Sequence, residues 1–354
     1  MSAVVRGDSG GLASVVEGSD AKALLGVAIR HKCAGRLWVA LDTYRIKAPR
    51  GLDMLPRYCA FAMSENIALQ EQCADLCARF ETHAIDCAVL KGGARLQTGD
   101  RAALCTRHYD IDVLVPAAEA ERAVALLRGH GYTPQYDTVA QSWYRAYHHH
   151  RVPLILEGEK PVELHVALAP PGDLSLATSW DALAAHLKPI AGSDHVFTLD
   201  PFARALHLAI HGAASGTLRD AVALAELLRD HAGLRDDLIR RLQQDTIAAV
   251  ALLTVVACAD DLLAGGEVLP GAAIRNRSWI ERREELPVWL RARSQFVDAW
   301  YQNGGSPFGR ATYRSFVRLA PYERMTALRA TAMAVRTLGR LATSVAAAAM
   351  AAFL

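Results

Sequence analysis

The stretch RHYDIDVLV, residues 107–115, places two acids two positions apart at the start of an apolar run. Side chains alternate between the two faces of a strand, so Asp110 and Asp112 share one face while Ile111 and Val113 enter the core. Two carboxylates this close repel each other strongly unless a cation lies between them. Mg²⁺, a hard cation that prefers oxygen ligands, is the expected occupant. The stretch therefore predicts a buried strand that carries a metal site.

A second strand with the same alternation is predicted where the chain reads VELHV, residues 162–166. Glu163 and His165 share its polar face, and its other positions are aliphatic. If this strand lies beside the first, Glu163 supplies a third carboxylate. Three carboxylates around one or two Mg²⁺ can activate a hydroxyl and neutralise a leaving pyrophosphate, as phosphoryl or nucleotidyl transfer requires. His165 is expected either to orient Glu163 or to line the cleft.

A glycine turn, Lys91-Gly92-Gly93, follows a short apolar run that ends at Leu90. Glycines at a helix N-terminus let backbone N–H groups approach phosphate oxygens closely, and Lys91 can add a positive charge. The turn lacks the second Gly and the Lys-Ser/Thr pair of a P-loop. A Gly-Gly pair alone is also common in ordinary turns, so this motif indicates a phosphate site only in combination with the Asp-x-Asp and Glu-x-His strands.

In this order, the three motifs resemble the core pattern of the polymerase-β-like nucleotidyltransferase superfamily. They resemble more closely a bacterial family of poorly characterised nucleotidyltransferases, over about residues 57–230. The resemblance implies that Asp110 and Asp112 bind Mg²⁺ and that Glu163 is the third acid and the base for the incoming hydroxyl. The remaining nucleotide-binding residues that it implies are Lys91, Gly92, Gly93, Arg107 and His165. Sixteen residues separate Gly93 from Asp110, which is more than the superfamily usually has and predicts an unusual connection.

The rest of the chain predicts an α+β fold in which a small mixed-sheet core has helical flanks. The expected parts are a flexible leader, an N-terminal helical segment, the α+β nucleotidyltransferase core and a C-terminal helical domain, over residues 1–19, 20–84, 85–170 and 171–354. Helical periodicity further predicts helices from residue 20 toward residue 41, and over residues 57–83, 117–130, 201–215, 218–231, 235–264, 279–302 and 321–354. Strands are predicted over residues 88–90, 111–115, 152–156 and 162–166, with the last two joined as a hairpin.

Composition excludes several classes of protein. The chain has 354 residues, of which 52% are hydrophobic, so disorder throughout is excluded. Its 39 Lys and Arg against 37 Asp and Glu argue against a general nucleic-acid binder. The longest uncharged runs have 14 residues, fewer than the 18 or so that a membrane span needs, and the first twenty residues do not read as a secretory signal. Seven Cys, an odd number, do not indicate a disulfide framework. With neither a membrane span nor a secretory signal predicted, a cytoplasmic location is the default expectation.

The expected function is Mg²⁺- or Mn²⁺-dependent transfer of a nucleoside monophosphate from an NTP, with ATP as the expected donor, to an acceptor hydroxyl. The acceptor is a small molecule, a peptide or a protein. The alternative is a non-catalytic nucleotide-binding adaptor whose helical domain recruits a partner.

Two other features leave alternatives open. The run of three histidines, His148 to His150, is compatible with a metal site, with a contact to substrate phosphate or with a solvated strand edge. Residues 275–340 contain thirteen Arg and five acids, which is compatible with a solvated helical face or with a surface for a phosphate-bearing partner. His207 and His211, four apart on a predicted helix, favour a histidine pair between domains over a zinc site.

Overall fold

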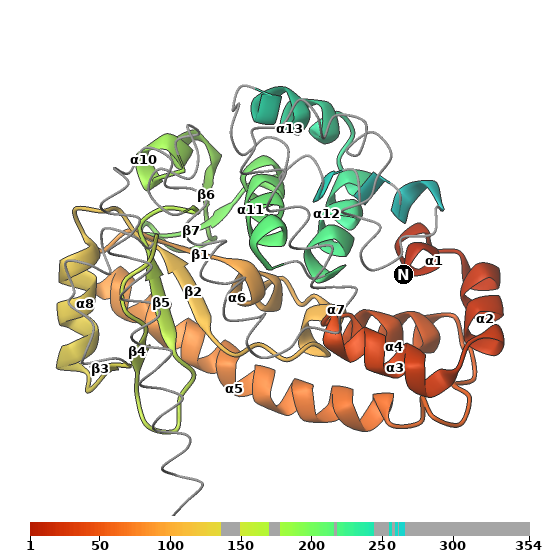
Figure 1. The fold of residues 1–354 in the computed structure, drawn as a ribbon. Coiled ribbons are helices and arrows are strands. Elements are labelled where there is room, and N and C mark those ends of the chain that lie inside the picture. The colour runs from red at the N-terminus through yellow and green to blue at the C-terminus, as the bar shows by residue number, and fades with distance from the viewer. Residues whose placement is uncertain are drawn as a thin grey trace, which may run out of the picture. The chain divides into compact units, whose positions relative to one another are not determined.

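In the computed structural model, the chain divides into two compact units, Met1–Val268 and Leu269–Leu354. The described residues all belong to the first unit (Figure 1). They are residues 1–135, 149–169, 178–215, 218–243, 255–256, 259–260 and 262–265. The helices predicted over residues 279–302 and 321–354, the Arg-rich stretch and His148 lie outside them.

A mixed sheet of seven strands lies at the centre of this unit, in the order β3-β4-β5-β2-β1-β7-β6. The strands are β1 (Cys87–Val89), β2 (Ile111–Leu114), β3 (Thr133–Pro134), β4 (Leu154–Ile155), β5 (Val162–His165), β6 (Leu187–Pro189) and β7 (Val196–Leu199). β2 runs parallel to β5 and antiparallel to β1, and β1 runs parallel to β7. The predicted hairpin is confirmed as the antiparallel pair β4 and β5. The α+β fold class is confirmed as well.

Some helices pack against the sheet, and the first four helices of the chain lie beside the end of the fifth that extends beyond it (Figure 1). Those before β1 are α1 (Ser2–Arg6), α2 (Ser9–Gly18), α3 (Ala21–Arg30), α4 (Ala34–Thr43) and α5 (Leu55–Thr82). Those after it are α6 (Lys91–Gln97), α7 (Arg101–Leu104), α8 (Ala120–Gly129), α10 (Trp180–Leu183), α11 (Pro201–Ser215), α12 (Leu218–Asp230) and α13 (Leu234–Gln243). The predicted helices that correspond to α5, α8, α11 and α12 are confirmed to within a few residues. Within the described ranges, every helix is too short or too polar to span a bilayer.

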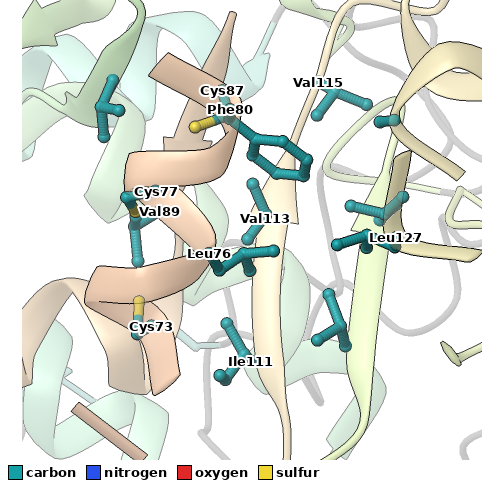
Figure 2. Packing of buried hydrophobic residues seen from close by; sticks show 14 of the residues in the cluster. Cys73, Leu76, Cys77, Phe80, Cys87, Val89, Ile111, Val113, Val115 and Leu127 are labelled. Carbon is teal, nitrogen blue, oxygen red and sulfur yellow. The ribbon is translucent and has the colours of Figure 1, made fainter. Parts of the chain in front are cut away.

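One face of the sheet packs against α5 and α8 and forms the main hydrophobic core. Cys73, Leu76 and Phe80 of α5 are buried at helical spacing, so the helix presents a continuous apolar stripe. Figure 2 shows this stripe beside Ile111 and Val113 of β2. Because side chains alternate along a strand, the polar residues of β2 point to the opposite face.

The opposite face carries a smaller core next to α11. Ala88 of β1 and Leu114 of β2 are buried there with Leu199 of β7 and Ala203 of α11. Asp112 lies on this face, since its neighbours in β2 point to the other. The site predicted from the Asp-x-Asp motif therefore lies on the α11 face of the sheet.

Residues 1–19, predicted as a flexible leader, differ from that expectation because they form α1 and α2. Asp8 caps α2 by accepting a hydrogen bond from the Gly11 backbone N–H (2.8 Å). Leu12 and Val16, one helical turn apart, are buried in a cluster with residues of α4. Frequent Gly and Ser lower the helix propensity of this segment, which is why its sequence did not indicate a helix.

The helix predicted from Asp20 toward Leu41 is interrupted, and α3 and α4 form in its place. The break lies at Lys32, whose φ of 55° is in the left-handed region. The Cys33 N–H donates to the Ala28 carbonyl (2.7 Å), a bond that closes the C-terminus of α3 as in a Schellman motif. Glycine is the usual residue at such a position, so a lysine there is uncommon.

The connection between Gly93 and Asp110 is long because it contains α7, which packs against α4 and α5. The fully buried Asn66 side chain of α5 donates hydrogen bonds to the carbonyls of Leu104 and Thr106 (both 2.7 Å) at the end of α7. The predicted core also ended too early, because β6 and β7 add to the sheet beyond residue 170. Both strands are short and lack a clear alternation, so the sequence did not indicate them.

A buried ion pair attaches the N-terminal helices to α12. Arg36 of α4 is 2% exposed, and its Nε and Nη2 donate to the two carboxylate oxygens of Glu226 (2.8 and 2.9 Å). Arg36→Met is expected to lower the free energy of unfolding by about 2 kcal/mol, less than for a fully buried pair because Glu226 is partly exposed. Urea unfolding measures this loss, with Arg128→Met on the exposed end of α8 as the control. If Arg36→Met had the same free energy of unfolding as the control, the ion pair between Arg36 and Glu226 would not stabilise the fold.

Candidate active site

The register of β2 and β5 brings the predicted acids together. Asp112 pairs with Glu163 across the two parallel strands, and Leu114 pairs with His165. The side chains of Asp112, Glu163 and His165 therefore share one face of the sheet. Asp112 is 2% exposed and His165 is fully buried, whereas Glu163 is partly exposed. The predicted neighbourhood of the two strands is confirmed.

Asp112 is the hydrogen-bonding centre of this group. Its Oδ1 accepts a bond from Lys91 Nζ (2.6 Å) and lies 2.8 Å from His165 Nε2. The same His165 nitrogen lies 3.7 Å from Glu163 Oε2. His165 thus lies within hydrogen-bond distance of Asp112 and slightly farther from Glu163, so its role in orienting Glu163 stays a prediction. Lys91 has a φ of 44°, an uncommon conformation for a residue other than glycine that occurs often at functional sites.

The two acids of the Asp-x-Asp motif have pKa values that are shifted in opposite directions. Burial, and then the neighbouring Asp112, raise the pKa of Asp110 to about 6. Burial also opposes ionisation of Asp112, but Lys91 and His165 outweigh it and hold the pKa of that carboxyl well below its usual range. Asp112 is therefore ionised at neutral pH, and Asp110 is the acid that gains most from a further cation.

The donor set fits a divalent cation. The ligand atoms of Asp112, Glu163 and His165 lie within 4.8 Å of one another. After burial, the charges of Asp112 and Glu163 raise the pKa of Asp110, and a divalent cation would remove this mutual repulsion. Carboxylate oxygens are the ligands that suit Mg²⁺ and Mn²⁺. These acids could therefore hold the predicted metal.

Packing requires both glycines of the Lys-Gly-Gly turn. A Cβ on Gly92 would lie 2.3 Å from Nδ1 of the His108 ring, and one on Gly93 would lie 2.8 Å from Cγ1 of Val89. Such distances are shorter than real contacts, so the turn and α6 could not pack as they do with larger residues. Lys91 and Gly92 also line a cavity of about 250 Å³ with residues of α11 and α12. The turn therefore borders a space that could hold a ligand.

Arg107 is bound by an acid outside the predicted site. Its guanidinium donates to both carboxylate oxygens of Glu65 on α5 (2.6 and 3.2 Å). It also stacks on the rings of Phe61 and Tyr109, at 5.0 and 5.1 Å from their centroids. Among the described residues, the guanidinium thus pairs with Glu65 and not with any of the three predicted acids.

Two residues of the histidine run pack beside the acids. His150 forms a bridge with His165, and the ring centroids of His149 and His150 lie 5.0 and 5.2 Å from that of His165. Of the alternatives for this run, a solvated strand edge does not describe His149 and His150. The Nδ1 atoms of His149 and His165 are buried and have no hydrogen-bond partner among the residues that the structure describes. The three consecutive histidines in the sequence indicated a possible role, but only the bridge between His150 and His165 showed that two of them lie beside the acids.

A second histidine pair lies on α11, where His207 and His211 are 6.5 Å apart between ring centroids. His207 is buried, and His211 bonds to Asp220 of α12 (3.0 Å). Both histidines line the cavity beside Lys91. The pair therefore connects α11 to α12 and borders the same space as the glycine turn.

His207 gives an expected pH dependence of stability. Burial holds the pKa of His207 well below its usual value, so the ring stays neutral in the folded protein while the unfolded chain takes up a proton below about pH 6.5. The free energy of unfolding should therefore fall with decreasing pH, by up to about 1.4 kcal/mol per unit below pH 6.5. Urea unfolding at pH 7.5 and 5.5 measures this slope.

The matched variants are His207→Asn, which should reduce that slope, and His130→Asn at the exposed end of α8, which should retain it. Equal slopes in the wild-type protein and the His207 variant would contradict the prediction.

A family model described as an uncharacterised nucleotidyltransferase matches residues 17–264. The match covers more than half of the chain and includes Lys91, the Asp-x-Asp strand and Glu163. A search of curated proteins and a search of solved structures each found no match. The matched range contains the carboxylate face of the sheet, and the description of the family supports nucleotidyl transfer as the general reaction. The chain belongs to this uncharacterised nucleotidyltransferase family.

Proposed function

We propose that the protein transfers a nucleoside monophosphate from an NTP, with ATP as the expected donor, to an acceptor hydroxyl and releases pyrophosphate. Mg²⁺ or Mn²⁺ is the expected cofactor. The observation that best supports the proposal is the register of β2 and β5, which places Asp112 beside Glu163 on one face. Asp110 directly precedes β2, and the charge of Asp112 acts on it. Membership of a nucleotidyltransferase family supports the reaction class.

In this reaction the acceptor oxygen attacks the α-phosphorus as the bond to the bridging oxygen breaks, and pyrophosphate leaves with the bonding electrons. Asp110, Asp112 and Glu163 are the proposed metal ligands, and the bound cation would supply charge neutralisation at the phosphates. Glu163 is partly exposed beside the buried Asp112, so it is the acid to which an acceptor can bring its hydroxyl proton. His165, whose Nε2 lies 2.8 Å from Asp112 and 3.7 Å from Glu163, is the residue proposed to orient these two acids.

The proposed phosphate contacts are Lys91, Gly92 and Gly93. Lys91 Nζ lies 2.6 Å from Asp112 at the start of α6, between the carboxylates and the cavity. An ammonium there can compensate the negative charge that develops on the leaving pyrophosphate. Arg107 is not included, because Glu65 holds its guanidinium.

Pyrophosphate release tests the proposal. The protein is incubated with each of the four common NTPs, Mg²⁺ or Mn²⁺, and acceptors drawn from small alcohols, sugars, peptides and proteins. We expect pyrophosphate with at least one NTP, together with a mass increase of one nucleoside monophosphate on an acceptor. Glu163→Gln is expected to lower the rate by about 10²-fold or more.

Two results would contradict the proposal. One is metal-independent release of pyrophosphate, or release that Glu163→Gln leaves unchanged. The other is that calorimetry detects nucleotide binding but no NTP is turned over, even when the protein encoded by a gene next to this one is added as the acceptor. That second result would favour the adaptor alternative.

A further inference from the structure

A lysine from the N-terminal helices contacts the residue that precedes Asp110. Lys32 occupies the turn between α3 and α4, and its ammonium lies 5.4 Å from the centroid of the Tyr109 ring. Tyr109 directly precedes Asp110. Lys32 is half-buried, and no carboxylate of the described residues lies within ion-pair distance of its ammonium. A partly buried cation without such a partner is unfavourable unless an anion joins it.

Two further cations lie near this lysine. Besides burial, the charges of Arg219 and Lys91 lower the pKa of Lys32, whereas Asp110 and Asp220 raise it. Arg219 of α12 lies 3.2 Å from Asp220 and lines the cavity with Lys91. Lys91 and Arg219 thus border one cavity, and Lys32, from a third part of the chain, is close enough for their charges to repel its own.

Backbone geometry and packing fix the position of Lys32. Its left-handed conformation, φ 55°, is one that glycine usually adopts at the end of a helix, so the side chain is retained there at a conformational cost. The adjacent His31 accepts a hydrogen bond from the Leu218 N–H (3.3 Å), next to Arg219. The ion pair between Arg36 and Glu226 attaches α4 to α12 close by. Lys32 and Arg219 are therefore held on the same side of the site.

We propose that Lys32, Lys91 and Arg219 together bind the β- and γ-phosphates of the NTP, so that the N-terminal helices complete the nucleotide site. This inference rests on the proposed function and adds two residues to it. Ammonium and guanidinium groups bind phosphate oxygens with charge-assisted hydrogen bonds. Lys91 contacts the Asp112 carboxylate, and Lys32 lies over the ring of Tyr109, the residue before Asp110. Both cations are therefore near the acids that would hold the metal, which is where the triphosphate has to bind. The family match, residues 17–264, includes both Lys32 and Arg219.

Calorimetry with inorganic tripolyphosphate in the presence of Mg²⁺ tests this inference without requiring turnover. The Lys32→Gln variant is expected to bind tripolyphosphate about tenfold more weakly than the wild-type protein, as for the loss of one charge-assisted hydrogen bond. Lys32→Arg should restore most of the affinity. Lys22→Gln, in the exposed first turn of α3, is the matched control and should bind as the wild-type protein does. Thermal unfolding of each variant shows whether the fold is intact.

Arg219→Gln provides a second measurement, with the same expected weakening for tripolyphosphate. If Lys32→Gln and Lys22→Gln bind equally well while the wild-type protein turns over ATP, the inference is overturned and the proposed function stands. If binding depends on Lys32 but no NTP yields pyrophosphate, the anion site stands and the proposed function fails. A wild-type protein that binds neither tripolyphosphate nor ATP would overturn both.

Discussion

Asp112→Asn is expected to lower the rate of pyrophosphate release by about 10³-fold. The buried Asp112 carboxylate accepts from Lys91, contacts His165 and faces Glu163. An amide of the same shape would keep the packing but remove the charge that attracts both the metal and the ammonium. The measurement is pyrophosphate release at saturating NTP, combined with thermal unfolding of the variant.

Two controls separate chemistry from folding in this experiment. Asp75→Asn removes an exposed acid that pairs with Arg79 on α5, and it should leave turnover unchanged. Glu163→Gln removes a proposed catalytic acid that is more exposed than Asp112, so it should lose turnover with less risk to the fold. If Asp112→Asn is folded and retains more than about a tenth of the wild-type rate, the carboxylate face is not the catalytic site.

Gly92→Ala is expected to lower the free energy of unfolding by about 2 kcal/mol and to reduce turnover strongly. A Cβ at this position would lie 2.3 Å from the His108 ring, so either the ring or the start of α6 must move. His108 is buried, which leaves the ring little room. Because Lys91 precedes this glycine, a displaced α6 would also move the ammonium away from Asp112. Urea unfolding and the steady-state rate measure the two effects.

A double variant tests whether this contact is the cause. Gly92→Ala combined with His108→Ala should lose less stability than the two single variants together, because the second substitution removes the clash. Gly129→Ala, at the end of α8 where a Cβ meets no atom within 4 Å, is the control and should be neutral or slightly stabilising. Additive losses in the double variant would show that the His108 ring does not set the requirement for glycine.

The centre of the fold could be predicted from the sequence because strong local patterns encode it. The alternation in β2 and β5 gave both strands and the shared face of Asp112 and Glu163, and the period of α5 gave its full length. Other elements were not predicted, because their sequence patterns are weak. In α1 and α2, Gly and Ser reduce the helical signal, and contacts with α4 stabilise these helices instead. β7 has four residues and depends on its pairing with β1.

The candidate site was only partly predictable, since its outer residues come from distant parts of the chain. Lys32 and Arg219, which we propose to complete it, carry no motif, and only the fold brings Lys32 to the ring of Tyr109, beside Asp110. Arg107 illustrates the opposite case. It lies three residues before Asp110 in the sequence, yet Glu65, from a helix more than forty residues earlier, binds its guanidinium. Proximity in sequence therefore did not predict its partner.

Parallel incubations with ATP labelled at the α- or the γ-phosphorus, in the presence of Mg²⁺, test the central claim most directly. The claim is that the carboxylate face formed by Asp110, Asp112 and Glu163 supports nucleotidyl transfer. We expect the α-label on the acceptor or in AMP and the γ-label in pyrophosphate, with both products lost in Asp112→Asn. The γ-label on the acceptor or in inorganic phosphate, or an α-label product that Asp112→Asn forms at the wild-type rate, would contradict the claim.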